Sequence, residues 1–173
     1  MPTAPSGVAV RRIAAAGVFL SVLLLGYLWL TKNPPTGPFE GELAPPFELV
    51  ALDGTAFASE NLQGKPVFIN FWATWCDPCL EEMPIIQRMH EKYGEALAIV
   101  AVTDEPVPIA SRYIARHGYT FPAYVDPAGA MTDDYLIHFL PTSLFVDASG
   151  IIRGRHTGQL SEEQMEAYIQ RIL

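Results

Sequence analysis

The longest uncharged run in the chain lies near the N-terminus, at residues 13–30 (IAAAGVFLSVLLLGYLWL). With a rise of about 1.5 Å per residue, this run forms a helix of about 27 Å, close to the thickness of a bilayer core. Arg11 and Arg12 precede it, so the positive-inside rule places residues 1–12 in the cytoplasm. A cleaved signal peptide is the alternative, but its apolar region is usually shorter and no A-x-A-like site follows Leu30. We therefore predict one transmembrane signal-anchor helix at 13–30.

The segment after this helix is rich in proline. Five of the 15 prolines lie within residues 31–46, a composition that favours an extended, semi-rigid spacer over packed structure. We assign residues 31–42 to this linker and residues 43–173 to one globular domain, which the anchor would hold on the extracytoplasmic, periplasmic side of the membrane. Half of all residues are hydrophobic, which is enough for a real core.

The hydrophobic pattern of the domain predicts strands and helices in alternation. Residues 47–62 (FELVALDGTAFASENL) indicate two short strands around an Asp53-Gly54 turn, a strong hairpin signal. Pro84 lies inside a predicted helix that continues to Tyr93, where it predicts a kink rather than an end. The other predicted elements are strands at 65–71, 96–102 and 123–125, helices at 78–93, 109–118, 128–138 and 161–173, and a hairpin at 143–156 that turns at 148–150. This alternation indicates an α/β domain with a mixed sheet and an antiparallel hairpin at one edge.

Charge narrows the range of partners. The formal net charge is −8, and all 19 acidic residues follow residue 39 together with only eight of the 11 basic ones, which leaves −11 on that part of the chain. Because an acidic globule repels phosphate backbones, we predict no nucleic-acid partner. Arg112 and Arg116, one turn apart on a predicted helix, are interpreted as a solvated face.

The only two cysteines, Cys76 and Cys79, lie in FWATWCDPCLEEMP. A structural zinc site needs four ligands, and the four histidines are scattered along the chain, so we predict no metal. A structural disulfide across two intervening residues would remove little entropy from the unfolded chain. The third role, a reversible dithiol, fits best, because a strand followed by C-x-x-C at the start of a helix is typical of redox-active pairs.

Helix geometry assigns a role to each sulfur. The first sulfur lies over the unpaired amides at the positive end of the helix dipole, which favours its thiolate. Cys76 is therefore the expected nucleophile, and Cys79, one turn along, resolves the mixed disulfide. Asp77 adds negative charge beside Cys76 and opposes thiolate formation, from which we predict a reducing rather than an oxidising pair.

Three segments together resemble a known family: APPFELVALDG, then LQGKPVFINFWATWCDPCLEEMP, then LPTSLFVDASGIIRGRHTG. They are similar to the membrane-anchored thioredoxin-like thiol–disulfide oxidoreductases typified by TlpA, ResA and CcmG. The resemblance implies a thioredoxin-like fold, with a mixed central sheet flanked by helices, an N-terminal β-hairpin and an inserted helix. It also implies a cis peptide at Pro141, with Leu140 and Thr142 beside it binding the partner peptide. From residue physics alone, a trans proline that starts a strand is the commoner case.

The sequence departs from cytosolic thioredoxins at Asn70, where that family leads one to expect a buried aspartate that accepts a proton. Asn70 cannot do so at neutral pH. The ResA-like pattern assigns this acid/base role to Glu82, and helix geometry agrees, since Glu82 is three residues after Cys79 and on the same face. Burial near sulfur would raise its pKa. The alternative is that Glu81 and Glu82 form a solvated face.

The predicted function is thiol–disulfide exchange with client proteins, without a cofactor. Trp75 is expected to be exposed and to contact the client, whereas Trp72 is expected in the core. The resemblance implies apocytochrome c as client, in cytochrome c maturation, and a membrane thiol carrier of the CcdA or DsbD type as electron donor. A Cu(I)-handling module for oxidase assembly is the alternative, although related copper handlers use C-x-x-x-C. Peroxidase chemistry is disfavoured, because Ala73 and Ile69 stand where peroxiredoxins have Thr and Pro.

Overall fold

The structure, a computed structural model, describes residues 18–29 and 34–173. It consists of two compact units, Met1–Pro35 and Thr36–Leu173. In the first unit, residues 18–29 are helical and their side chains are exposed. Residues 13–17 and 30 of the predicted anchor lie outside the described residues, as do residues 1–12 and 31–33. No helix within the described ranges combines the length and apolar character needed to span a bilayer. The anchor therefore stays a prediction.

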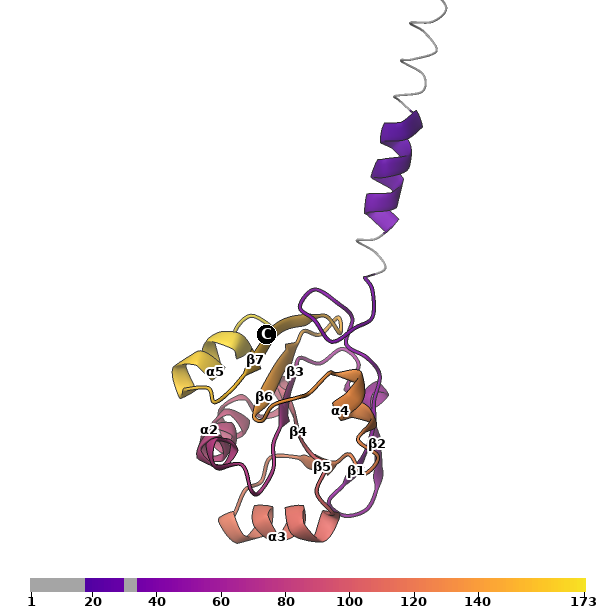
Figure 1. Cartoon of the computed structure of the whole chain (residues 1–173). Coiled ribbons are helices and arrows are strands. Elements are labelled where there is room, and N and C mark those ends of the chain that lie inside the picture. Colours follow the sequence, from indigo (N-terminus) through magenta and orange to yellow (C-terminus); the bar gives the residue numbers. More distant parts are fainter. Residues whose placement is uncertain (1–17, 30–33) are drawn as a thin grey trace, which may run out of the picture. The chain divides into compact units, whose positions relative to one another are not determined.

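The second unit alternates strands and helices as the sequence predicts (Figure 1). Its elements are β1 (Glu48–Ala51), β2 (Ala56–Ala58), the 3-10 helix η1 (Ser59–Leu62), β3 (Val67–Phe71), α2 (Asp77–Tyr93), the 3-10 helix η2 (Gly94–Ala96), β4 (Ala98–Thr103), α3 (Val107–His117), β5 (Ala123–Val125), α4 (Ala130–Asp134), β6 (Thr142–Val146), β7 (Ile152–Thr157) and α5 (Glu162–Ile169). Helix α2 continues through Pro84, and α5 begins after a capping box formed by Ser161 and Gln164.

The strands of residues 36–173 form one sheet in the order β2-β1-β5-β4-β3-β6-β7. The β3–β4 and β4–β5 pairs are parallel, and the other neighbours are antiparallel. The predicted mixed sheet is confirmed. Hairpins lie at both of its edges, because β1–β2 occupies one and β6–β7 the other. The central strand β3 is buried along its whole length, as its continuous apolar run predicts.

The two faces of the sheet carry separate cores, because successive side chains of a strand point to opposite faces. Phe68 belongs to the core that includes apolar residues of α2, α3 and α5. Its neighbour Ile69 belongs to the other core, with residues of α4 and Phe47. The fold therefore holds α2 against the central strand, and the position of α2 fixes the position of both cysteines.

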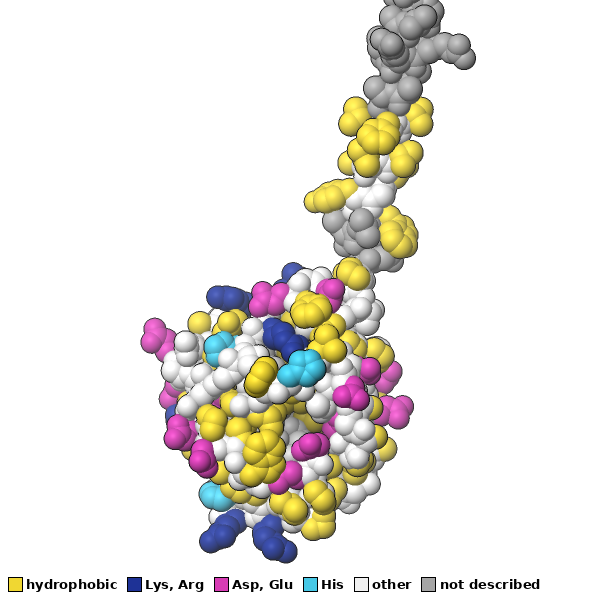
Figure 2. Space-filling view, viewed as in Figure 1, with side chains coloured by type: hydrophobic (Ala, Val, Ile, Leu, Met, Phe, Trp, Pro, Cys, Tyr) yellow, Lys and Arg dark blue, Asp and Glu magenta, His cyan; other side chains and the backbone are white. Residues whose placement is uncertain are grey.

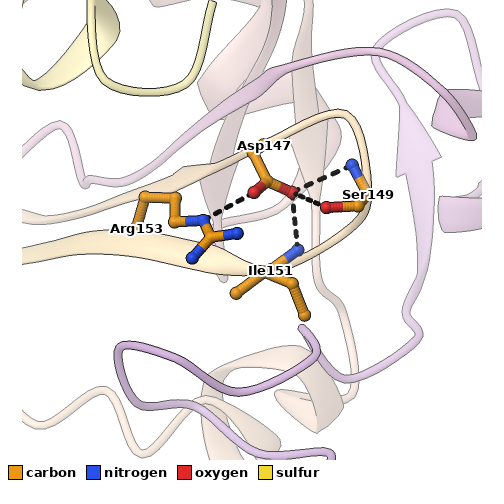
Figure 3. A network of polar contacts seen from close by, with 4 residues as sticks. All are labelled: Asp147, Ser149, Ile151 and Arg153. Carbon is orange, nitrogen blue, oxygen red and sulfur yellow. Dashed lines mark hydrogen bonds and ion pairs between the residues drawn. The ribbon is translucent and has the colours of Figure 1, made fainter. Parts of the chain in front are cut away.

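The turn between β6 and β7 is organised by Asp147 (Figure 3). One carboxylate oxygen accepts hydrogen bonds from the Ser149 amide at 2.9 Å, the Ser149 hydroxyl at 2.6 Å and the Ile151 amide at 3.1 Å. The other oxygen accepts one from Arg153 Nε at 2.6 Å. Burial raises the pKa of Asp147, but these hydrogen bonds outweigh it and hold the pKa below its ordinary value.

Residues 36–42, which the sequence analysis assigns to the linker, are hydrogen-bonded to this hairpin. The Gly41 amide donates to the Ile152 carbonyl at 2.8 Å, and the Ile152 amide donates to the Glu42 carbonyl at 3.0 Å. The Glu40 carboxylate accepts from the Arg155 amide at 2.9 Å. Proline content alone predicts an extended spacer, but the open edge of β7 offers backbone partners to this segment.

Helix α4 is shorter than the predicted helix at 128–138. The chain leaves the helix at Leu136, whose φ of 49° lies in the left-handed region that non-glycine residues rarely adopt. Arg155 explains this ending, because its guanidinium donates to the carbonyls of Tyr135 at 2.9 Å and Leu136 at 3.1 Å. It also donates to the Pro38 carbonyl at 3.1 Å. The guanidinium thus takes two carbonyls that a longer helix would use.

Replacing Arg155 with alanine should destabilise the domain by about 2 kcal/mol, because three carbonyls lose a charged donor. Arg153→Ala is the comparison on the same strand, because half-exposed Arg153 donates to one oxygen of a single, largely buried carboxylate and its loss should cost less, about 1 kcal/mol. Urea unfolding of both variants measures the difference. Equal losses of stability in the two variants would contradict the stabilising role of the hydrogen bonds from Arg155 to the three carbonyls.

Candidate active site

The two cysteines lie where β3 leads into α2. Cys76 is the N-cap residue of α2, and Pro78 occupies its first turn, where the missing amide hydrogen costs nothing. The sulfurs form a disulfide with an S–S distance of 2.04 Å. Both cysteines are buried, but Cys76 is 6% exposed and Cys79 is 1% exposed, so Cys76 is the more exposed residue of the pair. This pair can pass between disulfide and dithiol at the end of a helix whose dipole favours an anion.

The tryptophans on either side of this turn have opposite environments, as the sequence analysis expects. Trp72 is 1% exposed and packs in the core, whereas Trp75, directly before Cys76, is 69% exposed. Single exposed apolar side chains are common on protein surfaces, but this one directly precedes Cys76, the more exposed of the two cysteines. Trp75 therefore offers an apolar contact to any molecule that approaches the disulfide.

Glu105, in the loop between β4 and α3, holds the turn before Cys76. One carboxylate oxygen accepts from the Thr74 amide at 2.6 Å, and the other accepts from the Thr74 hydroxyl at 2.7 Å. The Thr103 hydroxyl accepts from the Glu105 amide at 3.3 Å, which orients this loop. Sequence reasoning missed Glu105, because a lone acid after a strand gives no signal of its own.

The segment before β6 lies at the same end of the sheet as the cysteines, because Thr142 pairs with Phe71, the last residue of β3. The Leu140–Pro141 peptide is cis. The Pro141 carbonyl accepts from the Gly158 amide at 2.8 Å, and Leu140 packs against the core that contains both cysteines.

The side chains next to the Leu140–Pro141 peptide differ in their exposure to solvent. Thr142 is buried, and its hydroxyl donates to the Phe139 carbonyl at 2.7 Å. The Phe139 side chain itself is 71% exposed, beside the cis peptide. His138, next to it in the chain, is also exposed.

Glu82 is completely buried, on α2. One carboxylate oxygen accepts from the Leu160 amide at 2.9 Å, and the other accepts from Asn70 Nδ2 at 3.2 Å. Asn70 Nδ2 also donates to the Ser143 hydroxyl at 3.1 Å. Burial raises the pKa of Glu82 to about 7, although the bonds from Leu160 and Asn70 act in the opposite direction.

This environment excludes a solvated helix face for Glu82. Glu81 is exposed, as a solvated helix face requires, but Glu82 is not. A carboxyl group with a pKa of about 7 exchanges its proton near neutral pH. Glu82 lies about one turn after Cys79, on the buried side of the same helix. Within the described part of the chain, no group of three His, Cys, Asp or Glu side chains is placed to hold a metal ion.

Comparison with known proteins identifies the family. The sequence profile of the Redoxin family matches residues 39–172. The chain belongs to the Redoxin family. Similar proteins include the thioredoxin-like protein YneN of Bacillus subtilis, 34% identical over 160 residues that cover 87% of this chain and 93% of YneN. The thiol-disulfide oxidoreductase ResA of Geobacillus kaustophilus is 32% identical over 168 residues, covering 94% of this chain and 97% of ResA.

The fold of this Redoxin-family member also matches solved structures. A thiol:disulfide interchange protein of the thioredoxin family from Chlorobium tepidum superimposes with a TM-score of 0.67 at 29% identity, covering 78% of this chain and 96% of that one. The thioredoxin-like α/β fold is thereby confirmed. With the C-x-x-C pair formed by Cys76 and Cys79, this Redoxin-family chain is a thiol–disulfide oxidoreductase of the ResA type.

Proposed function

We propose that this oxidoreductase reduces disulfides of exported client proteins on the outer side of the cytoplasmic membrane. The observation that supports this most is the Cys76–Cys79 disulfide at the start of α2, with the buried carboxyl group of Glu82 one turn behind it. A thioredoxin-like reductant needs an accessible first sulfur, an enclosed second sulfur and a proton acceptor with a suitable pKa. Three observations support this proposal: Cys76 is more exposed than Cys79, Cys79 is enclosed, and burial raises the pKa of Glu82 to about 7.

In the proposed reaction, the Cys76 thiolate attacks one sulfur of the client disulfide. A mixed disulfide forms between Cys76 and the client, and the client's other sulfur leaves as a thiolate. Cys79 then attacks the Cys76 sulfur, which releases the second client thiol. The client gains two electrons, and the protein ends in the disulfide form described above.

Glu82 is the proposed acceptor of the Cys79 proton. The second step requires a Cys79 thiolate, and Cys79 is 1% exposed, so water has little access to remove the proton. Asn70 cannot ionise, but its amide donates to the Glu82 carboxylate and orients it. A carboxyl group with a pKa of about 7 can take this proton and later release it.

Five residues around the disulfide are the proposed client-binding groups. Trp75 supplies an exposed apolar ring before Cys76. Pro141, held cis, lies in the segment at the same end of the sheet, and the backbone of Leu140 and Thr142 is proposed to pair with the client chain on either side of it. The exposed ring of Phe139 extends this apolar surface.

The membrane tether, the client and the electron donor are proposals of the same kind. Arg11, Arg12 and the uncharged run at 13–30 support the anchor. Disulfides persist outside the cytoplasm, so a reductant there needs a membrane thiol carrier of the CcdA or DsbD type to recharge it. The resemblance to the TlpA, ResA and CcmG family implies apocytochrome c as the client.

A Cys79→Ser variant tests this function. It should retain clients on Cys76 as mixed disulfides, because the second step lacks its nucleophile. After alkylation and purification, mass spectrometry of the trapped species should identify exported proteins, with apocytochrome c among them. Cys76→Ser is the control and should trap none.

Two outcomes of this experiment would contradict the proposal. Trapping that is equal in the two variants would show that Cys76 is not the attacking sulfur. Recovery of a copper oxidase subunit as the dominant species, together with stoichiometric transfer of Cu(I) to the apo-oxidase, would favour the Cu(I)-handling alternative.

A further inference from the structure

The basic residues of the domain are almost all engaged. Four of them form ion pairs with carboxylates, Arg155 donates to backbone carbonyls, and Arg171 lies over the ring of Tyr168. The two remaining guanidinium groups, those of Arg112 and Arg116, have no ion-pair or hydrogen-bond partner within residues 36–173. Both residues are exposed and lie one turn apart on α3.

Within residues 36–173, Arg112 and Arg116 lack acidic partners, although acidic residues are plentiful in the domain. The part of the chain after residue 39 has a net charge of −11. Like charges four residues apart destabilise a helix by about 0.2–0.5 kcal/mol. The helix dipole accounts for Arg116 and His117, which lie in the last turn of α3, but Arg112 lies before that turn. In Figure 2, Lys or Arg and His side chains lie over α3 at the lower end of the view, and others lie near the upper end of the domain, with acidic groups between and along the sides.

A surface hollow of about 380 Å³ brings these charges together beside the active site. We call it the α3 pocket, and it is lined by Thr74, Ile109, Arg112, Tyr113, Arg116 and His117. Thr74 precedes Cys76 by two residues, so the pocket adjoins the turn that carries the disulfide. The nearby carboxylate of Glu105 is engaged by the Thr74 amide and hydroxyl.

We propose that the α3 pocket binds acidic side chains of the client, in the segment that flanks the client's disulfide. This inference rests on the proposed function, because it requires protein clients. Guanidinium groups bind carboxylates through two parallel hydrogen bonds, and Ile109 and Tyr113 supply apolar surface for the methylene groups of a glutamate. An acidic client segment is repelled by most of the domain and attracted here, so the pocket orients the client on the disulfide.

The test uses two peptide disulfides that differ only in whether glutamates or glutamines flank the cysteines. At low salt, the full-length protein should reduce the glutamate peptide with a kcat/KM about fivefold higher, mostly through KM, as expected for one or two exposed ion pairs. In the Arg112→Gln/Arg116→Gln variant the ratio should fall to about one. Turnover of bis(2-hydroxyethyl) disulfide, which has no charge, should be unchanged.

The control is Arg153→Gln/Arg171→Gln, which removes two positive charges outside the α3 pocket. It should keep the preference for the glutamate peptide. Equal kcat/KM for both peptides in the wild-type protein would overturn the inference, and so would a preference that survives in the Arg112→Gln/Arg116→Gln variant. In either case the peptides are still reduced, so the proposed function is not contradicted. Failure of the wild-type protein to reduce either peptide would contradict the proposed function itself. Loss of the preference in inorganic phosphate, but not in chloride of equal ionic strength, would assign the pocket to small oxyanions instead.

Discussion

Replacing Glu82 with glutamine should lower the rate of client reduction at pH 7 about tenfold to a hundredfold, because the resolving step loses its proton acceptor. The wild-type pH–rate profile should show a titration near the Glu82 pKa of about 7, and the variant should lack it. Stopped-flow measurement of the resolving step between pH 5 and 9 gives the profile.

The same substitution should change how stability depends on pH. Burial raises the folded-state pKa of Glu82 above its unfolded value, so its favourable contribution is complete below about pH 4.5 and is lost as pH rises through about 7. The wild-type protein should therefore lose about 2 kcal/mol between pH 5 and pH 8 relative to Glu82→Gln. Rotation of the Asn70 amide would let the new side chain keep its hydrogen bonds, since Asn70 now donates to Glu82.

Glu81→Gln is the matched control, because Glu81 is the exposed neighbour on the same helix. It should leave both the pH–rate profile and the stability curve unchanged. If Glu82→Gln also kept the wild-type rate and profile, the proton acceptor would have to be another group.

The features that could be predicted from the sequence are those determined by neighbouring residues. The continuous apolar run of β3, the Ser161–Gln164 capping box and the two cysteines at a helix start each lie within a few positions of one another. The spacing of Cys79 and Glu82 likewise follows from one helical turn. Local pattern is sufficient in these cases, because the interacting groups share one element.

The features that the sequence did not predict arise from contacts between distant segments. Arg155 ends α4 by taking carbonyls about twenty residues away, and no periodicity in 128–138 signals that. Glu105 reaches Thr74 across 31 positions. The backbone of Gly41 and Glu42 pairs with Ile152 of β7, which lies far along the chain, and proline content does not signal that contact.

Replacing Asp77 with asparagine should change the reduction potential of the Cys76–Cys79 couple. Strong thiol oxidases owe their potentials, of about −120 mV for DsbA, to a stabilised thiolate in the reduced form. Here Asp77, the first residue of α2, adds a negative charge directly after Cys76. That charge destabilises the thiolate and therefore the reduced form, which shifts the potential toward more negative values. Asp77→Asn should raise the potential by about 10–30 mV, because 30 mV corresponds to about 1.4 kcal/mol.

Titration of the Cys76–Cys79 couple against glutathione tests most directly whether this protein is a reductant. Alkylation of the quenched samples, followed by mass spectrometry, gives the oxidised fraction at each glutathione ratio. We expect a potential near that of thioredoxin, about −270 mV. A potential near −120 mV, roughly that of DsbA, would contradict the proposed direction of electron flow.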